Sequence, residues 1–359
     1  MNLRADFQDM RVCKGIADTI RRESGRPVVI MEVCGGHTMA IHRYGIHSLL
    51  PAAISLISGP GCPVCVSDIR FIDRAVALAR RKDSIIATYG DLIRVPGSSS
   101  SLEKERASGA DVRVIWSALE AVSIAENNPD KKIVFLAIGF ETTAPGTAIA
   151  VVEADTKKLT NYFVLSSHKI MPPAMTALID KGVKIDAYLC PGHVSVITGA
   201  GIYEPIAREY GKSCVVSGFE PADILQSILM IVRQIEKGIP AVEIQYTRAV
   251  KPSGNIKAQE LIKEVFMLRD DWWRGLGVIP ESGMTLRPRF EAFNAEAIQV
   301  DVEPAKEVKG CICGEILKGL KAPAQCPLFA KACTPDHPVG ACMVSSEGSC
   351  AAYFQYRSR

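Results

Sequence analysis

Short apolar runs alternate with amphipathic stretches along the first two thirds of the chain. Most runs are continuous rather than alternating, which is typical of strands buried on both faces of a parallel sheet. They predict strands at residues 28–33, 54–57, 85–88, 112–116, 133–138, 162–165, 185–189 and 214–216. Helical patterns lie between them, as at residues 67–81, where Ser67 is the expected N-cap. The order predicts an α/β fold with parallel sheets.

The pattern changes at two places, which divides the chain into three expected domains. Turn residues at 127–130 end a helix before a new strand begins. From about residue 246 the pattern gives way to irregular sequence rich in Trp, Gly and Pro. We therefore expect an α/β domain at residues 1–129, a second at 130–245, and an irregular or helical domain at 246–359. A chain of 359 residues is long enough for two or three domains.

Composition and charge narrow the classes of function. Hydrophobic residues make up 48% and charged residues 23%, which is ordinary for a globular protein and excludes a disordered or fibrous one. The net charge is only +3, so nothing indicates nucleic-acid binding. No apolar run reaches the roughly 20 residues of a membrane span, and the first ten residues hold no signal-peptide core. We expect a cytoplasmic protein that binds neither nucleic acid nor membrane.

The twelve cysteines are the most informative part of the composition. In a reducing compartment they are more often metal ligands or redox thiols than structural disulfides. Six of them fall in the last 49 residues, namely Cys311, Cys313, Cys326, Cys333, Cys342 and Cys350. Four thiolates suffice for an iron–sulfur cluster or a structural zinc ion, but the spacing is neither that of a zinc finger nor the compact ferredoxin run. Three interpretations of the six cysteines therefore stay open: ligands of an iron–sulfur cluster, ligands of a structural zinc ion that holds the tail together, and thiols without redox activity.

Two glycine-rich motifs follow the first two predicted strands. Cys34 begins Cys-Gly-Gly-His-Thr, and Cys62 and Cys65 form a Cys-x-x-Cys loop. Consecutive strands of a parallel sheet are usually neighbours, so the three cysteines should converge at one sheet edge, where ligands bind. A helix beginning after Cys34 is expected to lower the pKa of its thiol. Together with His37 they suit iron, zinc or a thiol-redox centre, although Cys34 alone could be a buried free cysteine in a glycine turn.

The other polar motifs carry weaker signals. His37, His42 and His47 are spaced by five residues, which would point successive side chains about 140° apart on one helix. We therefore expect His42 and His47 to be solvated or core residues rather than metal ligands. Polar loops after later strands, including residues 139–146 and 190–193, could line a cleft or simply connect elements. The chain has neither a P-loop nor a G-x-G-x-x-G motif, so no motif predicts a nucleotide site.

In this order, the motifs resemble those of the hydrogenase maturation family HypD. The resemblance covers nearly the whole chain. It rests on CGGHT at 34–38, GPGCPVC at 59–65, TYGDLIRVPGS at 88–98, GFETTAPGTA at 139–148, SSHK and MPPAM within 166–175, CPGHVS at 190–195 and WRGLGVIPESG at 273–283. The tail follows the family spacing C-x14-C-x6-C-x16-C at Cys311, Cys326, Cys333 and Cys350, whereas Cys313 and Cys342 fall outside it.

The resemblance implies two Rossmann-like parallel-sheet domains and a C-terminal cysteine-rich domain. Cys311, Cys326, Cys333 and Cys350 would bind a [4Fe-4S] cluster there. It also implies that the protein works with HypC to hold one iron ion while two cyanides and one carbon monoxide are attached. HypE would supply cyanide as a thiocyanate, and the finished group would pass to the large subunit of a [NiFe]-hydrogenase.

Within that scheme each N-terminal cysteine has an expected role. Cys34 would ligate the mononuclear iron, with His37 as its hydrogen-bond partner or proton donor. Cys62 and Cys65 would cycle between dithiol and disulfide and pass electrons on. Two alternatives remain on residue chemistry: a cluster-dependent disulfide reductase that needs only Cys62 and Cys65, and a zinc-stabilised binding scaffold without redox activity. Whether the protein is an enzyme or a scaffold stays open at this point.

Overall fold

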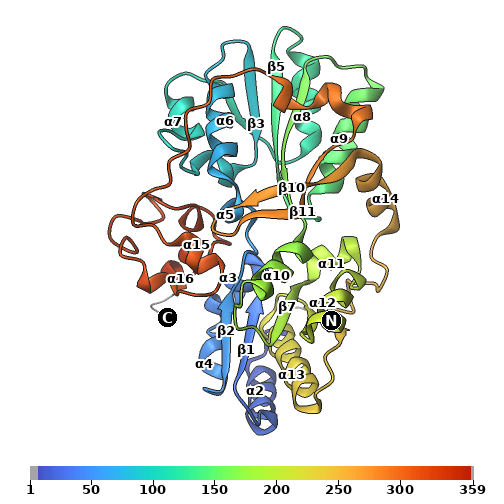
Figure 1. Ribbon diagram of the computed structural model, residues 1–359, viewed down its shortest axis with the longest axis vertical. Coiled ribbons are helices and arrows are strands. Elements are labelled where there is room, and N and C mark those ends of the chain that lie inside the picture. The colour runs from blue at the N-terminus through green and yellow to red at the C-terminus, as the bar shows by residue number, and fades with distance from the viewer. Residues whose placement is uncertain (1–6, 357–359) are drawn as a thin grey trace.

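The computed structural model describes residues 7–356, and the strands β1 to β9 form two separate parallel sheets (Figure 1). The first sheet has the strand order β2-β1-β7-β8-β9 and the second has the order β4-β3-β5-β6. The strands are β1 (Val28–Glu32), β2 (Ile54–Ser58), β3 (Ser84–Thr88), β4 (Val112–Val114), β5 (Lys132–Gly139), β6 (Tyr162–His168), β7 (Ala187–Pro191), β8 (Ser213–Ser217) and β9 (Val242–Ile244). All pairs in both sheets are parallel, which confirms the predicted α/β class.

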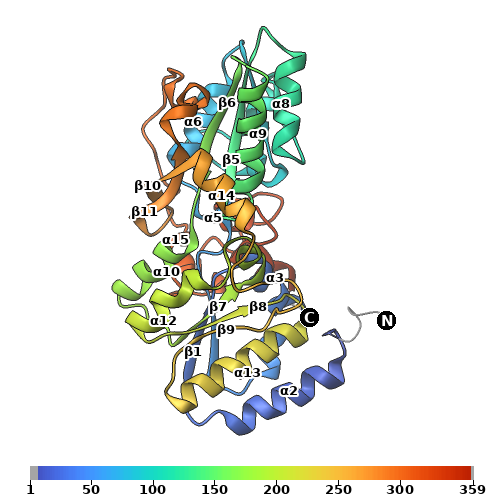
Figure 2. The same cartoon turned by 90° about the vertical axis from the view of Figure 1, so that its right-hand side faces the viewer.

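Helices cover the sheets, which is why the strands are continuous apolar runs. Helices α2 (Met10–Glu23) and α13 (Pro221–Lys237) lie side by side against the first sheet (Figure 2). Helices α8 (Ala118–Asn127) and α9 (Ala144–Thr156) pack against the second. Between residues 10 and 240 the other helices are α3 (Gly35–Arg43), α4 (Ile46–Leu49), α5 (Pro63–Val66), α6 (Ile69–Ala79), η1 (Gly90–Arg94), α7 (Leu102–Ala107), α10 (Met171–Asp180), α11 (Gly192–Thr198), η2 (Gly201–Tyr203) and α12 (Glu204–Tyr210). None of the helices within residues 7–356 is long and apolar enough to cross a membrane.

The grouping of the strands differs from the expected division at residue 129. Strands β1 and β2 share a sheet with β7, β8 and β9, while β3 and β4 join β5 and β6. We call the five-stranded sheet with its helices the first lobe and the four-stranded sheet with its helices the second lobe. The turn at residues 127–130 therefore connects α8 to β5 inside the second lobe. Local turn residues mark the end of a helix, but they carry no information about which strands pair. The first lobe is consequently built from two separate parts of the chain.

The C-terminal region crosses between the lobes and carries a feature that the sequence pattern missed. Strands β10 (Phe266–Trp273) and β11 (Gly277–Leu286) form an antiparallel hairpin in the part expected to be irregular or helical. Buried Lys169 anchors the hairpin, because its Nζ lies 2.8 Å from Asp271 Oδ2 and 2.9 Å from the carbonyl of Trp272. The remaining elements are α14 (Ile256–Val265), η3 (Pro288–Phe293), η4 (Ala295–Ala297), α15 (Cys313–Leu317), η5 (Pro323–Gln325), η6 (Ala341–Met343) and α16 (Ser349–Tyr356).

One buried cluster joins the lobes to this C-terminal region. It extends from Met31 in the first sheet to Val134 in the second, and it includes Trp273 of the hairpin and Cys342 of the tail. The cysteine-rich tail, drawn in red in Figure 1, lies beside α3 and α5 between the two lobes. The expected cysteine-rich C-terminal region is confirmed, and the fold brings it to the carboxyl edge of the first sheet.

Two helix starts differ from the prediction. Helix α6 begins after Asp68, whose side chain accepts a hydrogen bond from the backbone N–H of Arg70. Ser67, the expected N-cap, instead donates from its hydroxyl to the carbonyl of Pro63 at 2.9 Å, because the chain forms the short helix α5 first. The polar, helix-compatible start of the sequence predicts a helix at residues 6–24 as well, whereas α2 begins at Met10 with Asp9 as its N-cap; residue 6 lies outside the described residues.

Buried His168 makes the stability of the second lobe depend on pH. Its Nε2 lies 2.7 Å from Thr147 Oγ1, and burial lowers the pKa of His168 from 6.5 to about 4. As the pH falls, His168 is protonated near pH 6.5 in the unfolded protein but only near pH 4 in the folded protein. The contribution of neutral His168 to stability is therefore fully present above pH 6.5 and is lost progressively as the pH falls towards 4. The total loss is about 3 kcal/mol, at about 1.4 kcal/mol for each pKa unit.

We expect the urea unfolding free energy of the wild type to fall between pH 7.5 and pH 5 by about 2 kcal/mol more than that of His168→Gln. Glutamine does not titrate, so the difference between the two proteins isolates the contribution of His168. Equal falls for both proteins would show that His168 is not the group responsible.

Candidate thiol and metal centre

The two glycine-rich motifs meet at one edge of the first sheet, as the sequence predicts. Strands β1 and β2 are parallel neighbours, and Glu32 at the end of β1 is in register with Ser58 at the end of β2. The backbone N–H of Gly35 donates to the carbonyl of Gly61 at 3.0 Å. A Cβ atom at Gly61 would lie 2.5 Å from Cys34 Cα, so only glycine permits this approach.

Cys34 is buried at the start of α3 and is the N-cap of that helix. Its Sγ lies 3.7 Å from His193 Nδ1, and its backbone N–H donates to Glu32 Oε2 at 3.2 Å. His193 comes from α11, which follows β7, the other neighbour of β1. The sequence places His193 only in a polar loop, because the neighbouring position of β1 and β7 cannot be seen from the order of the chain.

The pKa of Cys34 differs from the prediction. Burial raises the pKa of the thiol well above its usual range, and the nearby carboxyl of Glu347 raises it further. The backbone N–H groups of His37 and Gly36 at the helix start lower the pKa, but their effect is smaller than that of burial. The expected lowering is therefore wrong for the protein by itself. A bound cation would supply the positive charge that favours the thiolate.

His37 is buried and belongs to a stack of rings beside Cys34. The ring of Phe219 lies 4.7 Å from that of His37 and 5.3 Å from that of His193. His37 Nε2 lies 2.9 Å from the carbonyl oxygen of Gly218, whereas its Nδ1 has no hydrogen-bond partner among residues 7–356. Burial lowers the pKa of both histidines to about 4, so both rings are neutral at pH 7.

Cys62 and Cys65 form a disulfide at the start of α5, with their Cα atoms 5.2 Å apart. Both residues are buried, and Cys62 Sγ accepts a hydrogen bond from the backbone N–H of Cys65 at 3.2 Å. Cys65 Sγ also lies 3.9 Å from the carbonyl oxygen of Ala341 in η6. The pair therefore lies between the Cys34 motif on one side and the cysteine-rich tail on the other.

The six tail cysteines lie near one another, but they are not grouped as the family spacing implies. The sulfur atoms of Cys311 and Cys313 are 3.3 Å apart, and the side chain of Cys313 also interacts with Cys342 and Cys350. A Cβ atom at Gly340 would lie 2.6 Å from Cys313 Sγ, so glycine lets the chain pass over these sulfurs. The contacts thus include both cysteines that fall outside the spacing.

Cys326 and Cys333 have other partners. Cys326 Sγ lies 3.9 Å from the carbonyl of Gly310, and Cys333 Sγ accepts from the backbone N–H of Val339 at 3.4 Å. Within residues 7–356 no three or more His, Cys, Asp or Glu side chains are gathered as a group that could hold a metal ion. The donor chemistry nevertheless fits, because six soft thiols in one region are consistent with a metal cluster.

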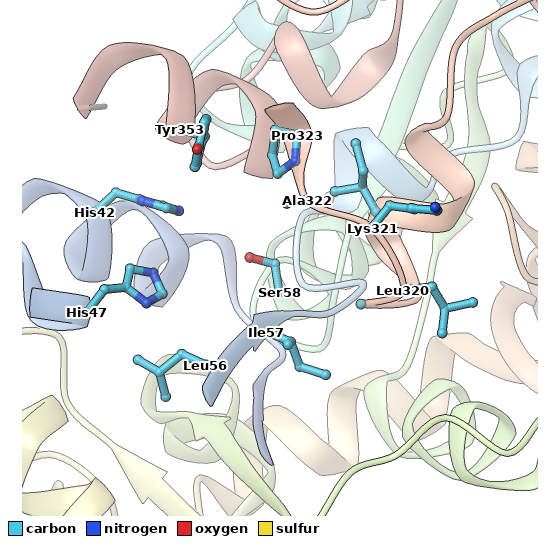
Figure 3. Close-up of a pocket in the computed structure, with 12 residues that line it drawn as sticks. His42, His47, Leu56, Ile57, Ser58, Leu320, Lys321, Ala322, Pro323 and Tyr353 are labelled. Carbon is cyan, nitrogen blue, oxygen red and sulfur yellow. The ribbon is translucent and has the colours of Figure 1, made fainter. Parts of the chain in front are cut away.

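His42 and His47 also differ from the arrangement that their spacing predicts. Helix α3 ends at Arg43, and Gly45 with φ of 63° turns the chain into α4, so the two rings lie 5.1 Å apart. They line a cavity of about 220 Å³ between the first lobe and the tail, together with Ser58 and with Tyr353, whose ring lies 5.5 Å from that of His42 (Figure 3). The prediction assumed one continuous helix, which Gly45 interrupts.

Comparison with known proteins now identifies the family. A family model named HypD, described as the hydrogenase formation hypA family, matches residues 11–357. The hydrogenase maturation factor HypD2 of Bradyrhizobium diazoefficiens and the hydrogenase maturation factor HypD of Cupriavidus necator are each 46% identical over 98% of this chain and 96% of their own length. A putative hydrogenase expression/formation protein of Methanocaldococcus jannaschii is 45% identical over 98% of this chain and 99% of its own. The chain therefore belongs to the HypD family of hydrogenase maturation factors.

Proposed function

We propose that this maturation factor is the scaffold on which one iron ion receives two cyanides and one carbon monoxide, with Cys34 as the ligand that this chain gives to the iron. The observation that carries the proposal is the position of Cys34. Its buried sulfur lies beside His193 Nδ1 at 3.7 Å, and its turn is hydrogen-bonded to the loop of the Cys62–Cys65 pair. An iron ligand and a redox pair thus share one sheet edge.

Release of cyanide from a thiocyanate is a two-electron reduction, which gives the Cys62–Cys65 pair its role. The sulfur–carbon bond breaks, cyanide binds the iron through carbon, and the sulfur leaves as a thiolate. The thiols of Cys62 and Cys65 supply the two electrons and become a disulfide. Of their two protons, one goes to the leaving thiolate and the other to solvent. The disulfide found between Cys62 and Cys65 supports this role, and a second cycle requires its reduction.

The tail would serve that reduction. Cys311, Cys326, Cys333 and Cys350 would hold a [4Fe-4S] cluster, whose chemistry when bound is the storage of single electrons. Cys313 and Cys342 interact with each other, and Ala341 next to Cys342 contacts Cys65. These contacts support a second thiol pair, which would become a disulfide as Cys62 and Cys65 regain two electrons and two protons.

The partners are those that the resemblance to the HypD family implies. HypC would complete the coordination of the iron, because this chain offers one thiol beside a redox pair. HypE would bring cyanide as the thiocyanate of a cysteine, and the large subunit of a [NiFe]-hydrogenase would receive the finished group. We place the reaction in the cytoplasm, where reduced thiols persist.

Infrared spectroscopy tests the proposal. We expect the protein, purified anaerobically after co-expression with HypC and HypE, to show cyanide and carbonyl stretching bands. If it shows no bands although it binds both partners and has the visible absorption of an iron–sulfur protein, the disulfide-reductase function takes first place. The buried Cys62–Cys65 disulfide beside the tail would serve that function equally well.

A further inference from the structure

A buried carboxyl group lies where the two glycine-rich motifs meet. Glu32 is the last residue of β1 and is 2% exposed. Its Oε1 accepts from the hydroxyl of Thr38 at 2.5 Å, and its Oε2 accepts from the backbone N–H of Cys34 at 3.2 Å. The hydroxyl of Ser58, at the end of β2, donates to the same carboxyl group. One side chain therefore joins the Cys34 turn, helix α3 and the second strand.

This position is costly for an acidic residue, which makes a purely space-filling role a poor explanation. The neighbours Met31, on β1, and Val33, directly after it, are fully buried apolar residues, as expected along a central strand. A buried carboxyl group lowers stability unless donors satisfy its oxygens. Here a backbone N–H and two hydroxyls do so, and all three come from the motifs that carry the cysteines or from the strand that leads into them.

Both cysteine motifs contain glycines next to their cysteines. Gly35 and Gly36 follow Cys34, and Gly59 and Gly61 precede Cys62. Glycine backbones have the greatest conformational freedom, so such turns need fixed hydrogen bonds to hold one geometry. Besides its side-chain bonds, Glu32 accepts at its backbone carbonyl from the N–H of Gly59 at 2.8 Å. It thus contacts both glycine-rich turns at once.

We propose that Glu32 is a positioning residue, which holds the Cys34 turn and the loop of the Cys62–Cys65 pair in register for the iron chemistry. The inference rests on the proposed function of Cys34. Residues that orient a metal ligand through hydrogen bonds change metal affinity or activity about 10- to 100-fold when they are replaced. Glu32 acts through the backbone of the two turns, since its hydrogen bonds run to backbone groups and hydroxyls rather than to the sulfurs of the pair.

The three donors to the carboxyl group of Glu32 are not equivalent. Ser58 lines the cavity shown in Figure 3, where water can replace its hydroxyl. Cys34 and Thr38 are buried, so nothing replaces their bonds. We therefore expect a small effect for Ser58→Ala and a large one for Glu32→Gln, because glutamine has one acceptor oxygen where the carboxyl group has two and cannot accept from both Cys34 and Thr38.

The experiment compares Glu32→Gln with Asp73→Asn. Asp73 in α6 is also buried, and it accepts from the backbone N–H and the hydroxyl of Ser98 at 2.7 and 2.6 Å, away from the cysteine motifs. In Glu32→Gln we expect the cyanide and carbonyl bands of the co-expressed complex to fall about 10- to 100-fold. In the metal-free protein we expect Cys34 to be alkylated about tenfold faster, measured on its peptide by mass spectrometry. Asp73→Asn should change both by less than about twofold.

Wild-type bands and wild-type alkylation in Glu32→Gln would overturn the inference. If that variant does not fold, Thr38→Val removes one of the same bonds, and Thr38→Ser, which keeps the hydroxyl, should restore the bands. Failure of Thr38→Ser to differ from Thr38→Val would also overturn it. If wild type itself has no bands, the proposed function fails, whereas the alkylation rate of Cys34 still tests the role of Glu32.

Discussion

Replacing Cys34 by alanine is expected to remove the cyanide and carbonyl bands completely while the protein keeps its fold. Cys34 is the thiol at the meeting point of the two motifs, and its sulfur faces His193 at 3.7 Å. Without this sulfur the iron would lose the soft donor that the Cys34 turn offers, and only the redox pair would remain beside it. The measurement is the infrared spectrum of the co-purified complex, normalised to protein.

The tail provides the internal control for this variant. The six tail cysteines belong to another part of the chain, and their sulfurs contact one another or the tail backbone, so iron–sulfur absorption and acid-labile sulfide should equal those of wild type. Cys34→Ser is the matched variant, since it keeps the size of the side chain but replaces soft sulfur with harder oxygen. Bands of normal intensity in Cys34→Ala would remove Cys34 from the role of iron ligand and favour the reductase, which needs only Cys62 and Cys65.

Gly61→Ala should be among the most destabilising single substitutions in this protein. The new Cβ atom at position 61 would lie 2.5 Å from Cys34 Cα and closer still to the backbone nitrogen of Cys34. Both are backbone atoms in the turn between β1 and α3. No flexible side chain can move aside, so β1 and the Cys62 loop must separate. We expect a loss of at least about 3 kcal/mol in the urea unfolding free energy, or failure to fold.

Gly146→Ala is the control for this substitution. Gly146 lies in α9 and is exposed, and a Cβ atom there meets nothing within 4 Å. Alanine favours helix more than glycine does, so this variant should gain up to about 1 kcal/mol. An unfolding free energy of Gly61→Ala within about 0.5 kcal/mol of wild type would show that the two motifs do not approach as closely as described.

The positions of Cys34 and Glu32 could be predicted from the sequence, but the distant residues that complete the site could not. Glu32 lies near the end of the first apolar run and Cys34 follows it directly, and glycines beside a cysteine point to a turn with a function. The partner of Cys34, His193, lies about 160 residues further along the chain and follows a strand that pairs with β1. Periodicity indicates that a strand exists, but it does not state which strand is its neighbour.

The same limit applies to the tail. The number of cysteines and their concentration near the C-terminus are enough to indicate a metal or redox region. Spacing alone selects Cys311, Cys326, Cys333 and Cys350, whereas the folded chain brings Cys313 and Cys342 into contact with Cys311 and Cys350. Loops without regular structure have no periodicity from which such contacts could be predicted.

By itself the sequence determined the α/β class, the two cysteine motifs at the ends of the first two strands and the cysteine-rich tail, because these depend on local composition and on neighbouring residues. Only the tertiary structure decided the strand order, the antiparallel hairpin, the contact of His193 with Cys34, the pairing of His42 with His47 and the high pKa of Cys34. Those features depend on burial and on contacts between distant segments. Such contacts are set by how apolar surfaces pack in three dimensions.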